Sequence, residues 1–197
     1  MVGTDVTNEE HALTRLLILG PSLRAASSSA ALARALKERM SPRMEIASFD
    51  ISGLPHYNAD LGKPDAVAEL IAAIDAADGV LFVTPEYNYS IPGVLKNAID
   101  WASRPAYESV FRGKPCFVVS TSGGAMGGVR AQSHLKYILN GMLARVFPWQ
   151  EAIVPFANKK TEDGRFTDED ILAFIGAALD AFADWARLVG TREGQQH

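Results

Sequence analysis

At 197 residues, the chain is long enough for one domain with a single core and too short for two comfortable domains. Its composition, 48% hydrophobic and 21% charged, excludes the disordered and fibrous classes of protein. A net charge of −4, without any block of lysines or arginines, argues against nucleic acid as the main partner.

The ends of the chain and its cysteine favour a cytoplasmic location. Residues 1–14 are polar and acidic, whereas a signal peptide needs a basic start and an apolar stretch. Cys116 is the only cysteine and lies in an apolar run, which predicts a buried structural thiol and no internal disulfide. The apolar segment 171–189 is interrupted by three charged residues, so it predicts an amphipathic helix and no membrane span.

Continuous apolar runs alternate with segments of helical periodicity along the chain, and such runs are typical of strands buried on both faces. The predicted strands are 13–20, 43–49, 79–84, 114–121 and 151–154, and the predicted helices are 27–40, 65–77, 92–103, 129–147 and 169–189. Thr167, followed by Asp170, is the predicted N-cap of the last helix. The alternation predicts an α/β fold, with a parallel sheet covered by helices on both faces. We expect a single domain over 13–189, flanked by a flexible segment 1–12 and a flexible tail 190–197.

Three unusual loops, 21–29, 85–90 and 122–128, each follow a predicted strand. In a parallel sheet the carboxyl ends of the strands lie at one edge, where ligands bind. We therefore expect the three loops to form one site.

The first loop, PSLRAASSS, combines hydroxyl groups with one arginine at the start of a predicted helix. Helix N-termini, hydroxyls and guanidinium groups all favour a bound phosphate. Both the dinucleotide and the triphosphate fingerprints are absent, so a terminal monophosphate fits better. The alternative is that one serine caps the helix and the others are solvated.

The second and third loops favour a flat ligand. Tyr87, Asn88 and Tyr89 offer apolar ring faces beside hydrogen-bonding groups, although tyrosines in such a loop also suit a subunit contact. The glycines of 122–128 permit close approach of the backbone to a ligand, a weak signal when taken alone. A phosphate at one end and a flat ring at the other describe FMN.

Four segments, SLRAASSS, LPHYNAD, TPEYNYSIPGVLKNAIDW and GGVRAQSHL, together with DGRFTDED, resemble the NADPH-dependent FMN reductase family. This flavodoxin-like group includes flavin, quinone, azo-dye and chromate reductases, and the resemblance covers about 15–189. It implies a five-stranded parallel sheet of order 2-1-3-4-5, bound FMN, and NADPH or NADH as the reductant.

The resemblance also implies the site residues. It assigns the FMN phosphate to Ser22, Arg24, Ser27 and Ser29, and the flavin ring to Pro85, Glu86, Tyr87, Asn88, Ser122 and Gly123. Ser29 stands where the family commonly has asparagine, and Pro21 replaces the usual glycine and lacks a backbone N–H for the phosphate. No catalytic side chain is implied, and the four histidines lack the spacing of metal ligands.

The implied reaction passes hydride from nicotinamide to FMN and then to a small acceptor, which is a quinone, an azo compound, free flavin or a metal oxyanion. Because both substrates must use one open face of the ring, we expect ping-pong kinetics. A flavodoxin-type electron carrier with a protein partner is the main alternative, but such carriers tend to be strongly acidic, and this chain has 23 acidic against 19 basic residues. A nucleotide-modifying enzyme, such as a deoxyribosyltransferase, is the third hypothesis.

Two further expectations concern the surroundings of the site. Arg130 could meet the 2′-phosphate of NADPH, but an ion pair or a subunit contact is the commoner role, and His56 with Tyr57 could line the acceptor pocket. A homodimer or homotetramer is expected from the family and from a surplus of apolar residues near the site. These residues are Trp101, Tyr107, Phe111, Tyr137 and Met142.

Overall fold

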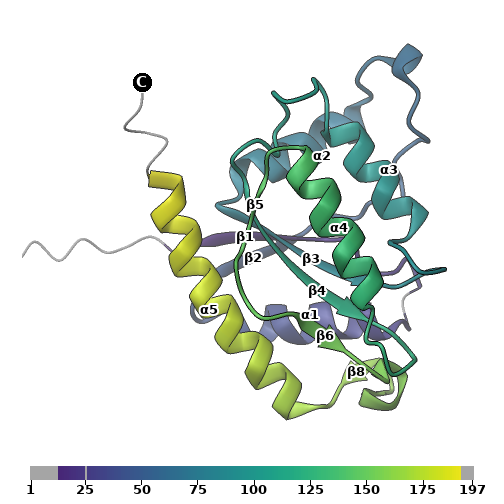
Figure 1. Ribbon diagram of the computed structural model, residues 1–197, viewed down its shortest axis with the longest axis vertical. Coiled ribbons are helices and arrows are strands. Elements are labelled where there is room, and N and C mark those ends of the chain that lie inside the picture. Colours follow the sequence, from purple (N-terminus) through teal and green to yellow (C-terminus); the bar gives the residue numbers. More distant parts are fainter. Residues whose placement is uncertain (1–12, 25, 192–197) are drawn as a thin grey trace, which may run out of the picture.

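The computed structural model describes residues 13–24 and 26–191, so the ends that we expect to be flexible lie outside the described residues except for 190 and 191. A parallel sheet of order β2-β1-β3-β4-β5 lies between two layers of helices (Figure 1). Its strands are β1 (Arg15–Leu19), β2 (Glu45–Ser48), β3 (Gly79–Pro85), β4 (Pro115–Thr121), β5 (Arg145–Val146) and β6 (Ala152–Val154). The α-helices are α1 (Ser28–Met40), α2 (Asp65–Ala76), α3 (Gly93–Ala102), α4 (Val129–Gly141) and α5 (Glu169–Thr191). The remaining elements are the short helices η1 (Ala59–Leu61) and η2 (Ala157–Lys160) and the hairpin of β7 (Thr161–Glu162) and β8 (Arg165–Phe166).

The sheet is apolar on both faces because each face is covered by helices. Successive side chains of a strand point to opposite faces. In β1, Leu16 and Ile18 therefore pack into the cluster formed with α1 and α5, and Leu17 and Leu19 pack into the cluster formed with α2, α3 and α4. This arrangement confirms the predicted α/β fold and its strand order.

The predicted helix 129–147 is wrong at its end. The helix α4 ends at Gly141, where Leu143 takes a left-handed φ of 61° and the Ala144 N–H bonds to the Leu139 carbonyl at 3.1 Å. The next residues form β5, which pairs with the start of β4, while β6 pairs with the end of β4. Phe147 is buried in the core, so apolar residues continue at helical spacing beyond the end of α4. Such spacing alone does not distinguish a short strand from the last turns of a helix.

The predicted N-cap of the last helix is also wrong, by one residue. The Asp168 carboxylate accepts the Ile171 N–H at 3.0 Å, whereas the Thr167 hydroxyl donates to the Lys160 carbonyl at 3.3 Å. The helix α5 then runs to Thr191, two residues beyond the predicted end. Within the described part of the chain, no helix has the length and apolar character that a membrane crossing requires.

Candidate functional site

A cavity of about 160 Å³ lies where β1, β3 and β4 end, and all three predicted loops contribute to it. Nine of the ten predicted site residues line it, namely Ser22, Arg24, Ser27, Ser29, Pro85, Glu86, Tyr87, Ser122 and Gly123. The expectation that the three loops meet at one edge of the sheet is therefore confirmed.

The serines of the first loop build a hydrogen-bonded cradle at the start of α1. Ser27 caps the helix by accepting the Ala30 N–H at 3.1 Å. The Ser29 hydroxyl accepts the Ser22 N–H at 3.1 Å and lies 3.3 Å from the Ser27 hydroxyl. One serine caps the helix, as the alternative predicts, but the other serines are buried and not solvated. The first N–H groups of α1 have no intrahelical acceptors and carry the positive end of the helix dipole, which favours an anion here.

Arg24 adds a positive charge to this cradle. Its N–H donates to the Ser22 hydroxyl at 3.3 Å, and its carbonyl accepts the Ser27 N–H at 3.0 Å. Its exposed side chain lines the cavity. Among the described residues, no carboxylate lies within ion-pair distance of its guanidinium, so the charge is available to a phosphate.

The second loop is a tight turn that connects to the first loop through one tyrosine. The Tyr87 hydroxyl lies 3.0 Å from the Ser22 hydroxyl. Tyr87 and Ser90 exchange two backbone hydrogen bonds, of 2.9 and 3.0 Å, around Asn88 and Tyr89, whose φ angles are 47° and 68°. This is the two-residue geometry that favours asparagine. Asn88 therefore occupies the tip of the turn and is the one predicted site residue that does not line the cavity.

Glu86 joins the second loop to the start of α4. Its side chain is only 12% exposed, and it accepts the N–H groups of Arg130 at 3.1 Å and Ala131 at 3.4 Å. The Arg130 guanidinium lies 3.4 Å from the other carboxylate oxygen and 4.6 Å from the centre of the Tyr89 ring. The helix start and the guanidinium thus compensate the charge of Glu86. The expected ion pair of Arg130 is confirmed.

Sequence reasoning missed part of the wall of the cavity. Ser28, Thr121, Ala157 and Asn158 also line it. The Asn158 side-chain oxygen accepts the Ser28 hydroxyl at 3.0 Å, and the Ala157 N–H donates to the Ser122 carbonyl at 2.9 Å. Because η2 follows β6, the same argument from strand ends that selected three loops would have selected this fourth one.

These residues suit FMN. Hydroxyl groups, a helix start and a guanidinium line the cavity together with Pro85, Tyr87 and the backbone of Gly123. A Cβ atom at Gly123 would come within 2.9 Å of the Asn158 amide nitrogen, so a larger residue there would displace the Asn158 side chain. The donor set fits a phosphate, and Pro85, Tyr87 and the glycine backbone fit the apolar faces of a ring.

The long loop before α2 is fastened to α3 and does not reach this cavity. The Pro55 carbonyl accepts the Asn97 amide at 2.9 Å and the Trp101 indole N–H at 2.8 Å, and the Tyr57 N–H donates to Asn97 at 2.7 Å. Tyr57 lines a separate cavity of about 220 Å³ between the loop, α2 and α3. Neither Tyr57 nor His56 lines the cavity at the strand ends.

Known proteins of one family are similar to this chain over most of its length. The model of the NADPH-dependent FMN reductase family matches residues 14–159. An NAD(P)H-dependent FMN reductase of Pseudomonas aeruginosa is 43% identical over 178 residues, 88% of this chain and 95% of that protein. A 2-hydroxy-1,4-benzoquinone reductase of a Burkholderia species is 37% identical over 88% of this chain and 96% of that protein.

A solved structure gives the same result. The flavoenzyme NAD(P)H:(acceptor) oxidoreductase FerB of Paracoccus denitrificans superposes with a TM-score of 0.80 at 36% identity, covering 89% of this chain and 98% of that chain. The family match over residues 14–159 spans every residue that lines the cavity at the strand ends. The chain belongs to the NADPH-dependent FMN reductase family.

Proposed function

We propose that this oxidoreductase transfers reducing equivalents from NAD(P)H, by way of FMN in the cavity at the strand ends, to a small flat acceptor. Quinones are the first candidates because relatives similar over most of the chain are quinone reductases. Azo compounds, free flavin and metal oxyanions are the others. The observation that carries the proposal is one cavity that combines a cradle of phosphate donors with Pro85, Tyr87 and the backbone of Gly123.

The protein's part in this reaction is to bind and orient. Ser22, Ser27 and Ser29, together with Arg24 and the start of α1, hold the phosphate. Pro85, Glu86, Tyr87, Ser122 and Gly123 would contact the ring, and Asn88 shapes the turn that follows Tyr87. When bound, FMN itself supplies the hydride chemistry, accepting two electrons from the nicotinamide and passing two electrons to the acceptor.

A ping-pong mechanism follows if both substrates use the same side of the ring. Tyr87 is 47% exposed, so the part of the cavity that would hold the flavin ring is open to solvent. Initial rates measured with NADPH and a benzoquinone both varied should give parallel double-reciprocal lines. Intersecting lines would show that both substrates bind together.

The decisive test of the function is anaerobic reduction of the bound flavin. Purified protein should carry or take up FMN and show its absorption spectrum, and NADPH or NADH should bleach that spectrum in a stopped-flow instrument. Oxidised spectra that persist with both nucleotides would contradict the reductase and favour an electron carrier. Membership of a family of oxidoreductases favours the reductase over the carrier and over a nucleotide-modifying enzyme.

We also propose that the enzyme is a homodimer or homotetramer in the cytoplasm. Of the apolar residues expected at an interface, Trp101 and Phe111 are buried within the fold, but Tyr107 and Tyr137 are 65% and 81% exposed. Exposed tyrosines of this kind suit a subunit contact. Sedimentation equilibrium should give a mass that is two or four times that of the chain, and a monomer mass would contradict the proposal.

A further inference from the structure

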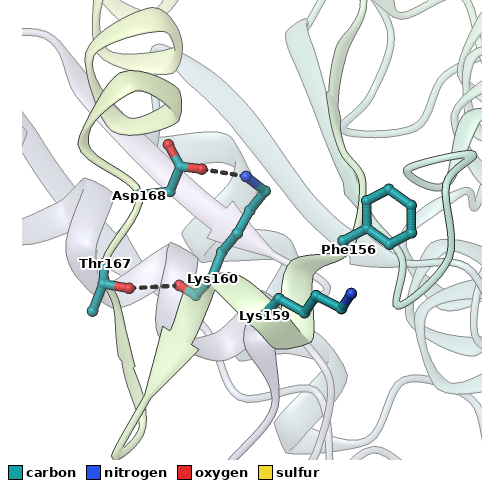
Figure 2. A pocket seen from close by; sticks show the side chains of 5 residues that line it. All are labelled: Phe156, Lys159, Lys160, Thr167 and Asp168. Atoms are coloured by element: carbon teal, nitrogen blue, oxygen red, sulfur yellow. Dashed lines mark hydrogen bonds and ion pairs between the residues drawn. The ribbon is translucent and has the colours of Figure 1, made fainter.

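A second cavity, of about 400 Å³, lies beside η2 and is shown in Figure 2. Its lining consists of Phe156, Lys159, Lys160, Thr167 and Asp168. The segment 156–160 contributes to both cavities, because Ala157 and Asn158 line the cavity at the strand ends, which we call the FMN cavity. We call the second cavity the lysine cavity. The lysine cavity is therefore separated from the FMN cavity only by η2, and one ligand could reach into both.

Phe156 presents an aromatic surface to the lysine cavity. Its side chain is 43% exposed, and its φ of 50° is left-handed, a conformation that is unfavourable for a non-glycine residue. Its N–H donates to the Gly124 carbonyl at 3.0 Å, so the backbone that carries the ring is tied to the glycine-rich loop of the FMN cavity. An exposed ring held in a strained backbone at the edge of a site is characteristic of a functional position.

The charges of the lysine cavity leave one cation available. The ammonium group of Lys159 lies 5.5 Å from the centre of the Phe156 ring, and no carboxylate of the described residues lies within ion-pair distance of it. Figure 2 shows Lys160 turned the other way, to the Asp168 carboxylate. The hydrogen bonds from Lys160 and from the Ile171 N–H hold the pKa of Asp168 below its usual value, so this carboxylate is charged and already paired.

We propose that the lysine cavity binds the adenosine 2′-phosphate end of NADPH, with Phe156 against the adenine and Lys159 on the 2′-phosphate. The inference rests on the proposed function, because the nicotinamide must reach the flavin ring in the neighbouring cavity. A base and a phosphate on one ribose match an aromatic face and an unpaired ammonium that lie side by side. Because NADH lacks this phosphate, the enzyme favours NADPH.

The test uses 2′,5′-ADP, which carries the adenosine 2′-phosphate but no nicotinamide, and the FMN-loaded protein in a calorimeter. Lys159→Ala should weaken binding of 2′,5′-ADP about tenfold, the loss of one charge-assisted hydrogen bond, while Lys159→Arg should retain it. Phe156→Asn removes the ring but keeps a residue that tolerates the left-handed backbone, and it should weaken the binding of 2′,5′-ADP and of 5′-ADP to the same extent. Lys37→Ala, an exposed lysine in the last turn of α1, is the matched control and should change nothing.

The kinetic readout separates this inference from the reductase function. Lys159→Ala should raise the KM for NADPH about tenfold and leave both kcat and the KM for NADH unchanged. A parent protein that does not bind 2′,5′-ADP, or a Lys159→Ala variant that binds it as tightly as the parent, would overturn the subsite even if flavin reduction proceeds normally. Failure of flavin reduction by both nucleotides would refute the function, whereas the subsite is judged by the binding of 2′,5′-ADP alone.

Discussion

Replacing Gly128 by alanine should test how closely the glycine-rich loop approaches the sheet. Gly128 precedes α4 with φ 86° and ψ 22°, and a Cβ atom there would lie 2.9 Å from the Ser120 Cβ and 3.0 Å from the Thr121 carbonyl oxygen. The left-handed backbone costs alanine about 1–2 kcal/mol, and the overpacking costs about 1–3 kcal/mol. The free energy of unfolding should therefore fall by about 2–5 kcal/mol.

The assay is equilibrium unfolding in urea, followed by far-ultraviolet circular dichroism. Gly93→Ala is the matched control, because Gly93 begins α3 with an ordinary φ and a Cβ atom there would meet nothing within 4 Å. This variant should be unchanged or more stable by up to about 1 kcal/mol. A Gly128→Ala protein within about 0.5 kcal/mol of the parent would refute the reasoning, since changes of that size are typical of unconstrained surface sites.

Three further predictions concern a helix cap, the core and the cysteine. Asp168→Asn keeps an N-cap but removes the carboxylate whose pKa is lowered in the folded protein, so the variant should lose about 0.5–1 kcal/mol of unfolding free energy above pH 4. In urea titrations this loss should disappear as the pH falls through the folded pKa of Asp168, because the parent carboxylate is then protonated. A loss that does not depend on pH would contradict this prediction. Gly79→Ala, whose Cβ would lie 2.8 Å from the Phe182 ring, should cost about 1–3 kcal/mol in the parent and less in a Phe182→Leu background, and an additive double-mutant cycle would count against it. Burial raises the pKa of the Cys116 thiol, so a disulfide reagent should label it only when urea unfolds the protein, and prompt labelling in native buffer would show that the thiol is accessible.

Much of the fold could be predicted because its strands are buried on both faces. The run 79–84 is apolar throughout and coincides with β3 to within one residue, since every position of that strand up to Thr84 is buried. The edge of the sheet was harder to predict. The edge position is occupied by two short strands, β5 and β6. Their apolar residues are too few to indicate a strand where the helical spacing of α4 continues into β5.

The site could be predicted to the level of loops but not of contacts. The strand ends place Ser22 and Tyr87 at one edge, but their hydrogen bond joins residues 65 positions apart and depends on the turn at Asn88. The pairing of Glu86 with the start of α4 likewise depends on how a helix is placed after a glycine-rich loop. Local patterns do not contain such distances, because tertiary packing decides them.

The hydrogen bonds between the 55–57 segment and α3 join main-chain groups of the loop to side chains of the helix, and the Tyr57 ring adds an edge-to-face contact with Trp101 at 4.9 Å between ring centres. Asn97 and Trp101 recognise the Pro55 carbonyl, and Asn97 also recognises the Tyr57 N–H, so no side chain of the loop takes part in these hydrogen bonds. Substitutions at residues 58–64, which follow the segment, thus leave these hydrogen bonds in place and do not release the segment from the helix. The chemistry of this surface can therefore change while the FMN cavity, which none of these residues lines, stays the same.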